Sequence, residues 1–150
     1  MLLDVRKLYT GGMSADIFRV IETTLPEQTD LEIDLCEHVL LTDPTHLEAM
    51  ALLGDAFTRK GEFQKGLEFD IRLSQLRPDN KLIRYNLACS YALTGQNDKA
   101  LTCLNKAIDL GYSDLEHLRQ DHDLDAIKTD PRYQTIIKKL ASLQPQTSPH

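Results

Sequence analysis

Apolar residues recur at helical spacing along much of the chain, and this pattern predicts pairs of amphipathic helices. Between residues 46 and 60, one apolar stripe consists of Leu47, Met50, Leu53 and Phe57. A second stripe consists of Phe63, Leu67, Leu73 and Leu76. Gly61 lies between them and can adopt the left-handed conformation that ends a helix, whereas Pro78 cannot continue the second one. We therefore expect two antiparallel helices joined by a tight turn.

The same arrangement of side-chain sizes returns 34 residues later. The size-matched pairs are Pro44 and Pro78, Leu53 and Leu87, Gly54 and Ala88, Phe57 and Tyr91, Gly61 and Gly95, Gly66 and Ala100, Leu67 and Leu101, and Leu76 and Leu110. Charged residues do not recur at this interval. Packing between helices fixes side-chain size, whereas solvent leaves surface charge free, so the pairs indicate a structural repeat.

The repeated unit resembles the tetratricopeptide repeat (TPR). That family's pattern has small residues near the middle of both helices, a large ring late in the first helix and a proline at the end. The matching positions are Leu53, Gly54, Phe57, Leu73 and Pro78 in one unit, and Leu87, Ala88, Tyr91, Gly95, Ala100, Leu104 and Ala107 in the next. The departures are Gly66, Asp70, Arg84 and Tyr112. The resemblance covers residues 45–112.

The resemblance implies an all-α fold, a right-handed α-solenoid of stacked antiparallel helix pairs with a C-terminal capping helix. We expect a single TPR-like domain over residues 1–142 and a disordered tail over 143–150. Its predicted parts are a degenerate repeat at 13–44, full repeats at 45–78 and 79–112, and a helical cap at 113–142.

Outside the two full repeats, shorter patterns predict further helices. In the degenerate repeat, Ser14 is the expected N-cap of its first helix and Asp30 that of its second. The apolar residues of that second helix are Leu35, Cys36, Val39 and Leu40. Downstream, Ser113–Glu116 is interpreted as a capping box, and Asp130 followed by Pro131 starts a last helix. Four apolar residues of this helix are expected to cover the open end of the last repeat: Tyr133, Ile136, Ile137 and Leu140.

Composition narrows the class of protein. Hydrophobic residues make up 41% of the chain and the net charge is −6, which argues against a nucleic-acid-binding or anionic-membrane surface. No stretch has the length of a membrane-spanning helix or the pattern of a secretory signal. Three cysteines, Cys36, Cys89 and Cys103, follow no disulfide or metal-ligand spacing, so we expect a reduced, cytoplasmic protein.

Candidate chemical sites are weak. A calcium loop starting at Asp121 would need glycine and glutamate where Ala126 and Arg132 stand, so "DHDLD" is interpreted as helix caps and solvated charge. The histidines lack paired ligand spacing, and no phosphate-binding loop is present. Cys36 and Cys103 fall on core-like positions, whereas Cys89 is expected on the inner face of its repeat. We expect no metal, no cofactor and no enzymatic activity.

Asp70 does not fit the apolar pattern of its helix. A carboxylate near the packed seam is costly without a partner. It either tilts to solvent or accepts a hydrogen bond, or it pairs with a basic group on a neighbouring element.

The resemblance also implies a ligand-binding face, because the first helix of every TPR unit lines a concave surface. The corresponding positions are Glu48, Ala51, Asp55, Thr58 and Arg59 in one repeat, Leu82, Tyr85, Cys89, Ala92 and Leu93 in the next, and Ile17 and Ile21 in the degenerate unit. They form an apolar floor beside an acidic edge. We expect a peptide segment with apolar anchors and a basic residue near Glu48 and Asp55. Coverage of this face by the protein's own N-terminal segment or by a second copy is the alternative.

The predicted function is that of a scaffold or adaptor which binds a protein or peptide partner in this groove. The alternatives are a structural homo-oligomer that assembles through exposed helical faces, and a secretion-type chaperone. Neither nucleic acid nor membrane is an expected partner.

Overall fold

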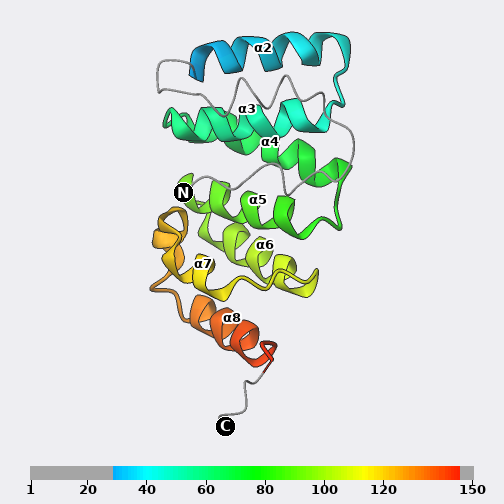
Figure 1. Ribbon diagram of the computed structural model, residues 1–150. Helices are drawn as coiled ribbons and strands as arrows, with labels where there is room; N and C mark the ends of the chain where they lie inside the picture. The colour runs from blue at the N-terminus through cyan, green and yellow to red at the C-terminus, as the bar shows by residue number, and fades with distance from the viewer. Residues whose placement is uncertain (1–28, 146–150) are drawn as a thin grey trace. The chain divides into compact units, whose positions relative to one another are not determined.

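The computed structural model describes residues 29–145 and contains only helices and connecting turns over that range. These residues divide into two compact units, one containing α2, α3 and α4 and the other containing α5 to α8 (Figure 1). The predicted all-α fold of consecutive helix pairs is confirmed. The handedness of the array and the boundaries of its repeats stay predictions, and Ser14, Ile17 and Ile21 lie outside the described residues.

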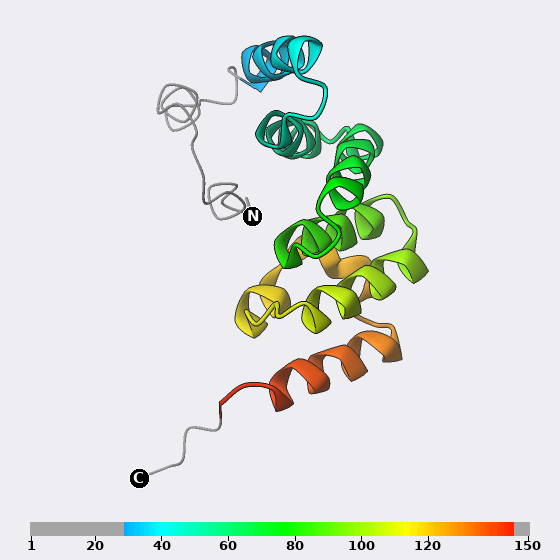
Figure 2. The ribbon, with the colours of Figure 1, turned by 90° about the vertical axis from the view of Figure 1, so that its right-hand side faces the viewer.

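In the first unit, α2 (Thr29–Thr42), α3 (Leu47–Arg59) and α4 (Phe63–Leu76) pack in chain order, α2 on α3 and α3 on α4. Figure 2 views α3 nearly along its axis, with α2 and α4 beside it. Helices α3 and α4 are the predicted pair. Asp30 was expected to cap α2 but lies within its first turn, where it pairs with Lys60 at 2.6 Å.

The turn between α3 and α4 has the predicted glycine stop. Gly61 has φ of +80°, and its N–H donates to the carbonyl of Thr58. The N–H of Glu62 donates to the carbonyl of Phe57 at 2.9 Å, which completes a Schellman motif. A side chain at residue 61 would be strained at this φ, so glycine is needed here.

Helices α3 and α4 cross closely at two glycines. A Cβ atom added at Gly66 would lie 2.5 Å from Thr58 Oγ1 and 3.0 Å from the carbonyl oxygen of Gly54. A Cβ atom added at Gly54 would lie 3.1 Å from Asp70 Oδ1. Asp70 is only 8% exposed, so it does not tilt to solvent; its carboxylate occupies the space that Gly54 leaves beside it.

The core of this unit lies between the three helices. Its buried apolar residues are Ile33, Cys36, Ala49, Leu52, Leu53, Ala56 and Phe57, with Val39, Leu40 and Phe69 packed against them. The ends of two predicted stripes are more exposed than expected: Phe63 and Leu76 are each 37% exposed and Leu35 is 40% exposed. They lie at helix ends or on the outer side of α2, beyond the area that neighbouring helices cover.

In the second unit, α5 (Lys81–Leu93) and α6 (Asn97–Asp109) form the next helix pair. The side chain of Asn80 caps α5 by accepting from the N–H groups of Leu82 and Ile83. Gly95 has φ of +77° and repeats the turn at Gly61. Ala88 and Ala100 are fully buried at positions equivalent to the two crossing glycines, as the repeat predicts.

Three shorter elements follow α6 in this unit. They are α7 (Leu115–Gln120), the 3-10 helix η3 (His122–Ile127) and α8 (Pro131–Ser142). Asp114, rather than the predicted Ser113, caps α7 by accepting from the N–H of His117. Asp130 and Pro131 open α8 as predicted.

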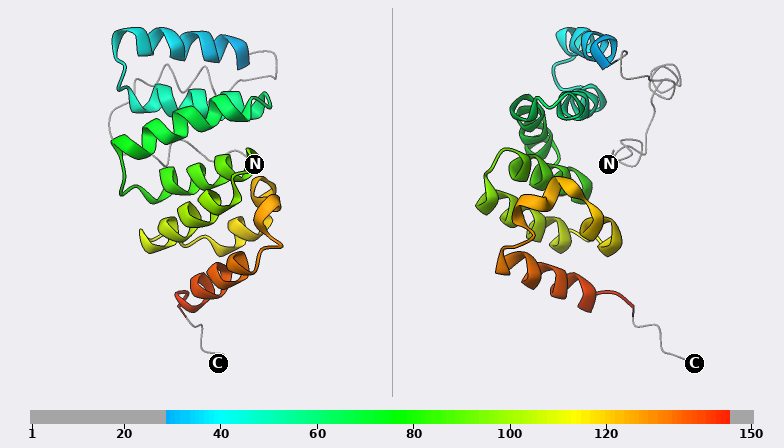
Figure 3. Two further views of the ribbon diagram at one scale, coloured as in Figure 1. Left: turned by 180° about the vertical axis from the view of Figure 1, so that it is seen from behind. Right: turned by 90° about the vertical axis from the view of Figure 1, so that its left-hand side faces the viewer.

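The apolar side of α8 faces the rest of this unit. Helix α8 packs on α6 and α7 (Figure 3). The four apolar residues that were predicted to cover the last repeat are buried. Lys139 on α8 also pairs with Asp109 at the end of α6 at 2.5 Å. The predicted cap is therefore present, and its last described residues reach position 145.

Candidate functional site

The predicted binding residues of α3 are partly accessible and charged. Glu48 lies in the first turn of α3. Asp55 and Arg59 follow on the same side of the helix and are one turn apart. The Arg59 Nε donates to Asp55 Oδ2 at 2.9 Å, and the two side chains are 25% and 26% exposed. These three residues therefore keep polar atoms within reach of solvent.

A fourth residue, which the sequence pattern does not indicate, joins this group. Glu32 on α2 accepts from Arg59 Nη2 at 2.8 Å through its Oε2 atom, while its side chain is only 2% exposed. Its Oε1 atom is buried without a hydrogen-bond partner. The ion-pair cluster of Glu32, Asp55 and Arg59 thus holds two carboxylates and one guanidinium. The cluster carries one surplus negative charge when all three groups are ionised.

Burial raises the pKa values of two carboxyl groups on α3. It raises the pKa of Asp55 above its usual value, although the nearby Arg59 opposes this shift. Burial also raises the pKa of Glu48, with His46 opposing. In both cases the anion has lost hydration that an added positive charge would compensate.

Two predicted residues of α3 take other positions. Ala51 is only 5% exposed. Thr58 faces α4, where its hydroxyl donates to the carbonyl of Gly54 at 2.9 Å and lies close to Gly66. These two residues do not offer side chains to a ligand in this structure.

The predicted binding residues of α5 are mostly covered by the chain's own C-terminal part. Tyr85 is fully buried, and Cys89 and Ala92 are 6% and 3% exposed, because η3 packs on α5. Their expected place on an accessible inner face is therefore wrong. Leu82 and Leu93 remain partly exposed near the two ends of α5.

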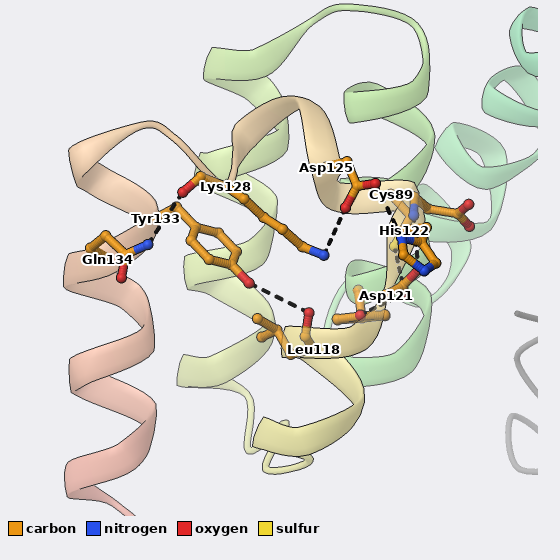
Figure 4. A network of polar contacts seen from close by, with 10 residues as sticks. Cys89, Leu118, Asp121, His122, Asp125, Lys128, Tyr133 and Gln134 are labelled. Atoms are coloured by element: carbon orange, nitrogen blue, oxygen red, sulfur yellow. Dashed lines mark hydrogen bonds and ion pairs between the residues drawn. The ribbon is translucent and has the colours of Figure 1, made fainter.

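A buried polar network holds η3 against α5. The Tyr85 hydroxyl donates to Asp121 Oδ2 at 2.7 Å, and the Cys89 thiol donates to the same oxygen at 3.7 Å. Asp121 Oδ1 accepts from the N–H of Asp123 at 3.0 Å and so caps η3. Figure 4 shows Cys89 and Asp121 meeting at this contact.

The surroundings of Asp121 explain why Tyr85 acts as a donor. Asp121 is 1% exposed, and the ring of Tyr85 stacks on that of Tyr112 with centroids 4.3 Å apart. A tyrosine hydroxyl is protonated at neutral pH, and burial raises the pKa of Tyr85 further, so this hydroxyl donates to the Asp121 carboxyl group. The histidine of α7, His117, approaches from another side, with Nε2 3.5 Å from Asp121 Oδ2.

This network also brings together atoms that can bind metals. Side-chain ligand atoms of Cys89, Asp121 and Asp123 lie within 4.8 Å of one another. Both carboxylate oxygens of Asp121, however, already accept hydrogen bonds from Tyr85 and from the Asp123 N–H. These ligand atoms therefore lie close together because their residues attach η3 to α5.

The other two cysteines are core residues, as predicted. Cys36 and Cys103 are 4% and 8% exposed and carry free thiols. Burial, together with nearby Glu32, raises the pKa of Cys36 to about 12. Burial also raises the pKa of Cys103. Such thiols have little nucleophilic thiolate near neutral pH.

Within residues 29–145, none of the helices combines the length and the apolar character needed to cross a bilayer. The compartment in which the chain works stays a prediction.

Comparison with known proteins agrees with the repeat architecture. The chain is similar to a chloroplastic protein of Arabidopsis thaliana, with 29% identity over 89 residues. That alignment covers 57% of this chain and 27% of the plant protein, so the chain spans about a quarter of that relative.

A family model gives the more specific result. Residues 83–110, which run from the first turn of α5 to the end of α6, match the tetratricopeptide repeat. The match falls on the helix pair with the small buried residues Ala88 and Ala100 and the glycine turn at Gly95. The size-matched pair α3 and α4 repeats the same design. The chain therefore contains a tetratricopeptide repeat over residues 83–110.

Proposed function

We propose that the chain is a protein-interaction module that holds a segment of a partner against the exposed side of α3. Tetratricopeptide repeats generally mediate protein–protein interactions and typically serve as scaffolds rather than enzymes. The partner segment places a lysine or arginine side chain near Asp55 and Glu48. Apolar side chains on either side of that residue supply the rest of the contact.

The ion-pair cluster carries this proposal. Glu32 and Asp55 share one guanidinium, Arg59, and Glu32 Oε1 is buried with no hydrogen-bond partner. A buried acceptor without a partner is unfavourable, and an extra cation nearby reduces the cost of the surplus charge. A basic ligand side chain is therefore favoured over an acidic one at this site.

The structure changes the set of residues that we assign to partner binding. Glu48, Asp55 and Arg59 on α3 stay in the proposed site and Glu32 is added to it. Leu82 and Leu93 stay separate candidates for apolar contacts, on α5 of the other unit. The buried residues Ala51, Tyr85, Cys89 and Ala92 are left out.

A peptide-display selection tests the proposal without knowledge of the natural partner. The full chain is immobilised, a random peptide library is selected on it, and the enriched peptides are sequenced. We expect lysine or arginine beside apolar residues in the enriched peptides. Asp55→Asn should remove the preference for a basic residue, because it abolishes one carboxylate charge while keeping a similar shape.

The matched control is Asp98→Asn, since Asp98 also pairs with an arginine, Arg132, at 2.8 Å, but in the other unit. This variant should select the same peptides as the unmodified chain. Enriched peptides without basic residues, or an unchanged selection on Asp55→Asn, would contradict the proposed site.

A further inference from the structure

A groove on a different side of the first unit lies between α2 and α4. It has a volume of about 540 Å³, within the range of pockets that bind small molecules. Its apolar lining includes Leu40, Leu53 and Phe69, of which Leu53 is fully buried. Asp55 and Arg59 are not among its lining residues, so this groove is separate from the site proposed above.

The two rims of the groove carry opposite charges. On the α2 side, two acidic residues, Asp34 and Glu37, are exposed beside His38. On the α4 side, Arg72 is exposed, with its Nη2 donating to the carbonyl of Pro44 at 3.1 Å and its guanidinium 5.5 Å from the centre of the Phe69 ring. Pro44 follows the end of α2, so Arg72 lies toward that end and Asp34 toward the other.

An exposed leucine stands at the edge of the same groove. Leu41 lines it and is 79% exposed, which makes it the most exposed of the large apolar residues within 29–145. It follows Glu37 and His38 on the same stripe of α2, at helical spacing. A surface that buried Leu41 would also cover the apolar floor of the groove.

We propose that this groove binds a second copy of the chain through an antiparallel contact between the two α2 helices. A two-fold interface brings the same patch of both copies together, so the patch must be complementary to itself. The antiparallel arrangement places Asp34 of each copy near Arg72 of the other. It also lets Leu41 of each copy enter the groove of the other.

The charge pattern favours a second copy over an unrelated segment. The groove has acidic residues on one rim and an arginine on the other. A complementary occupant carries a basic group opposite the acidic rim and an acidic group opposite the arginine. Helix α2 with its neighbouring α4 provides that arrangement when it is turned by the two-fold axis. It also provides an exposed apolar side chain, Leu41, at the position that the groove must bury.

Sedimentation equilibrium of the full chain over a series of concentrations tests the role of Leu41. We expect the unmodified chain to form dimers reversibly. Leu41→Glu should raise the dimer dissociation constant by about 100-fold, because two leucines lose their burial in each dimer. The matched control is Leu143→Glu, since Leu143 is also exposed, at 63%, but lies at the end of α8; it should leave dimerisation unchanged.

Charge reversal tests the pairing itself. Asp34→Lys or Arg72→Glu alone should each weaken dimerisation by about tenfold, whereas the two changes in one chain should restore it to within about threefold. Glu116→Lys, an equal charge change at an exposed position of α7, is the control and should have little effect. Circular dichroism confirms that each variant is folded.

Three results would overturn the proposal. The unmodified chain could stay monomeric at every concentration at which it is soluble. Leu41→Glu could match Leu143→Glu, or the paired charge reversal could associate no better than its single parents. A dimer that survives all of these changes would use another face.

Discussion

At the scale of single residues, the second unit depends on a carboxylate that has almost no contact with solvent. Asp121 is 1% exposed and accepts a hydrogen bond from Tyr85, which lies 36 residues earlier in the chain. It also caps η3, so one side chain fixes both the local helix start and its attachment to α5. Removing a donor from such a group leaves a buried acceptor short of a partner.

Tyr85→Phe should therefore destabilise the chain. The variant keeps the ring that stacks on Tyr112 but deletes the hydroxyl that donates to Asp121 Oδ2. We expect the free energy of unfolding to fall by about 1–3 kcal/mol, measured by urea denaturation. Tyr91→Phe is the control, since Tyr91 is only partly buried, and it should change stability by less than about 0.5 kcal/mol. Equal effects of the two variants would show that the buried hydrogen bond adds nothing.

The buried thiol of Cys36 gives a second prediction at this scale. Its pKa is raised to about 12 by burial and by Glu32, so the folded chain holds almost no Cys36 thiolate at pH 8. We expect iodoacetamide to leave Cys36 unmodified in the native chain and to label it once urea unfolds the protein, with the site read by peptide mass spectrometry. Rapid labelling of Cys36 before unfolding would contradict its place in the core.

At the scale of elements, the crossing of α3 and α4 depends on the missing side chain at residue 66. Gly66→Ala places a Cβ atom 2.5 Å from Thr58 Oγ1 and 3.0 Å from the Gly54 carbonyl oxygen. Overpacking costs about 1–3 kcal/mol, and this should exceed the roughly 1 kcal/mol that alanine gains over glycine inside a helix. We expect a lower melting temperature, with partial recovery in the double variant Gly66→Ala, Thr58→Ala. A stabilising effect of Gly66→Ala alone would mean that the helices separate easily at this point.

The helices themselves were largely predictable from the sequence, because their signals are local. Apolar spacing, the Gly61 and Gly95 turns and the Asp130–Pro131 start all act within a few residues. The cap of α7 shows the limit: Ser113 and Asp114 are both good N-caps, and local pattern alone does not choose between them. The structure uses Asp114.

The candidate site was less predictable, because its decisive contacts join distant segments. Nothing near Tyr85 or Cys89 indicates that "DHDLD" folds back over them. The cluster on α3 likewise depends on Glu32, 27 residues before Arg59. Alternating aspartates without the glycine of a calcium loop could have suggested a buried helix cap. Only the fold shows which residues that cap covers.

At the scale of the whole molecule, a repeat protein is held together by contacts between neighbouring elements, so damage to one end should stay local. Helix α8 packs on α6 and α7, and its Leu140 is 1% exposed. A cavity at a buried leucine lowers the free energy of unfolding by about 2–5 kcal/mol, and the helices around the cavity are destabilised first. A cap lost from one end therefore opens its own neighbours before more distant helices.

Leu140→Ala in the full chain, followed by amide hydrogen exchange and mass spectrometry, measures this directly. We expect faster exchange in α6, α7 and α8, with the exchange of α2 and α3 unchanged. Leu143→Ala, at a position 63% exposed, is the control and should leave every helix as protected as before. If Leu140→Ala accelerated exchange equally from α2 to α8, the chain would unfold as one cooperative block and the nearest-neighbour description would not apply to it. If exchange became faster only in α8, α6 would stay stable without α8 packed on it. The cap would then contribute to solubility rather than to stability.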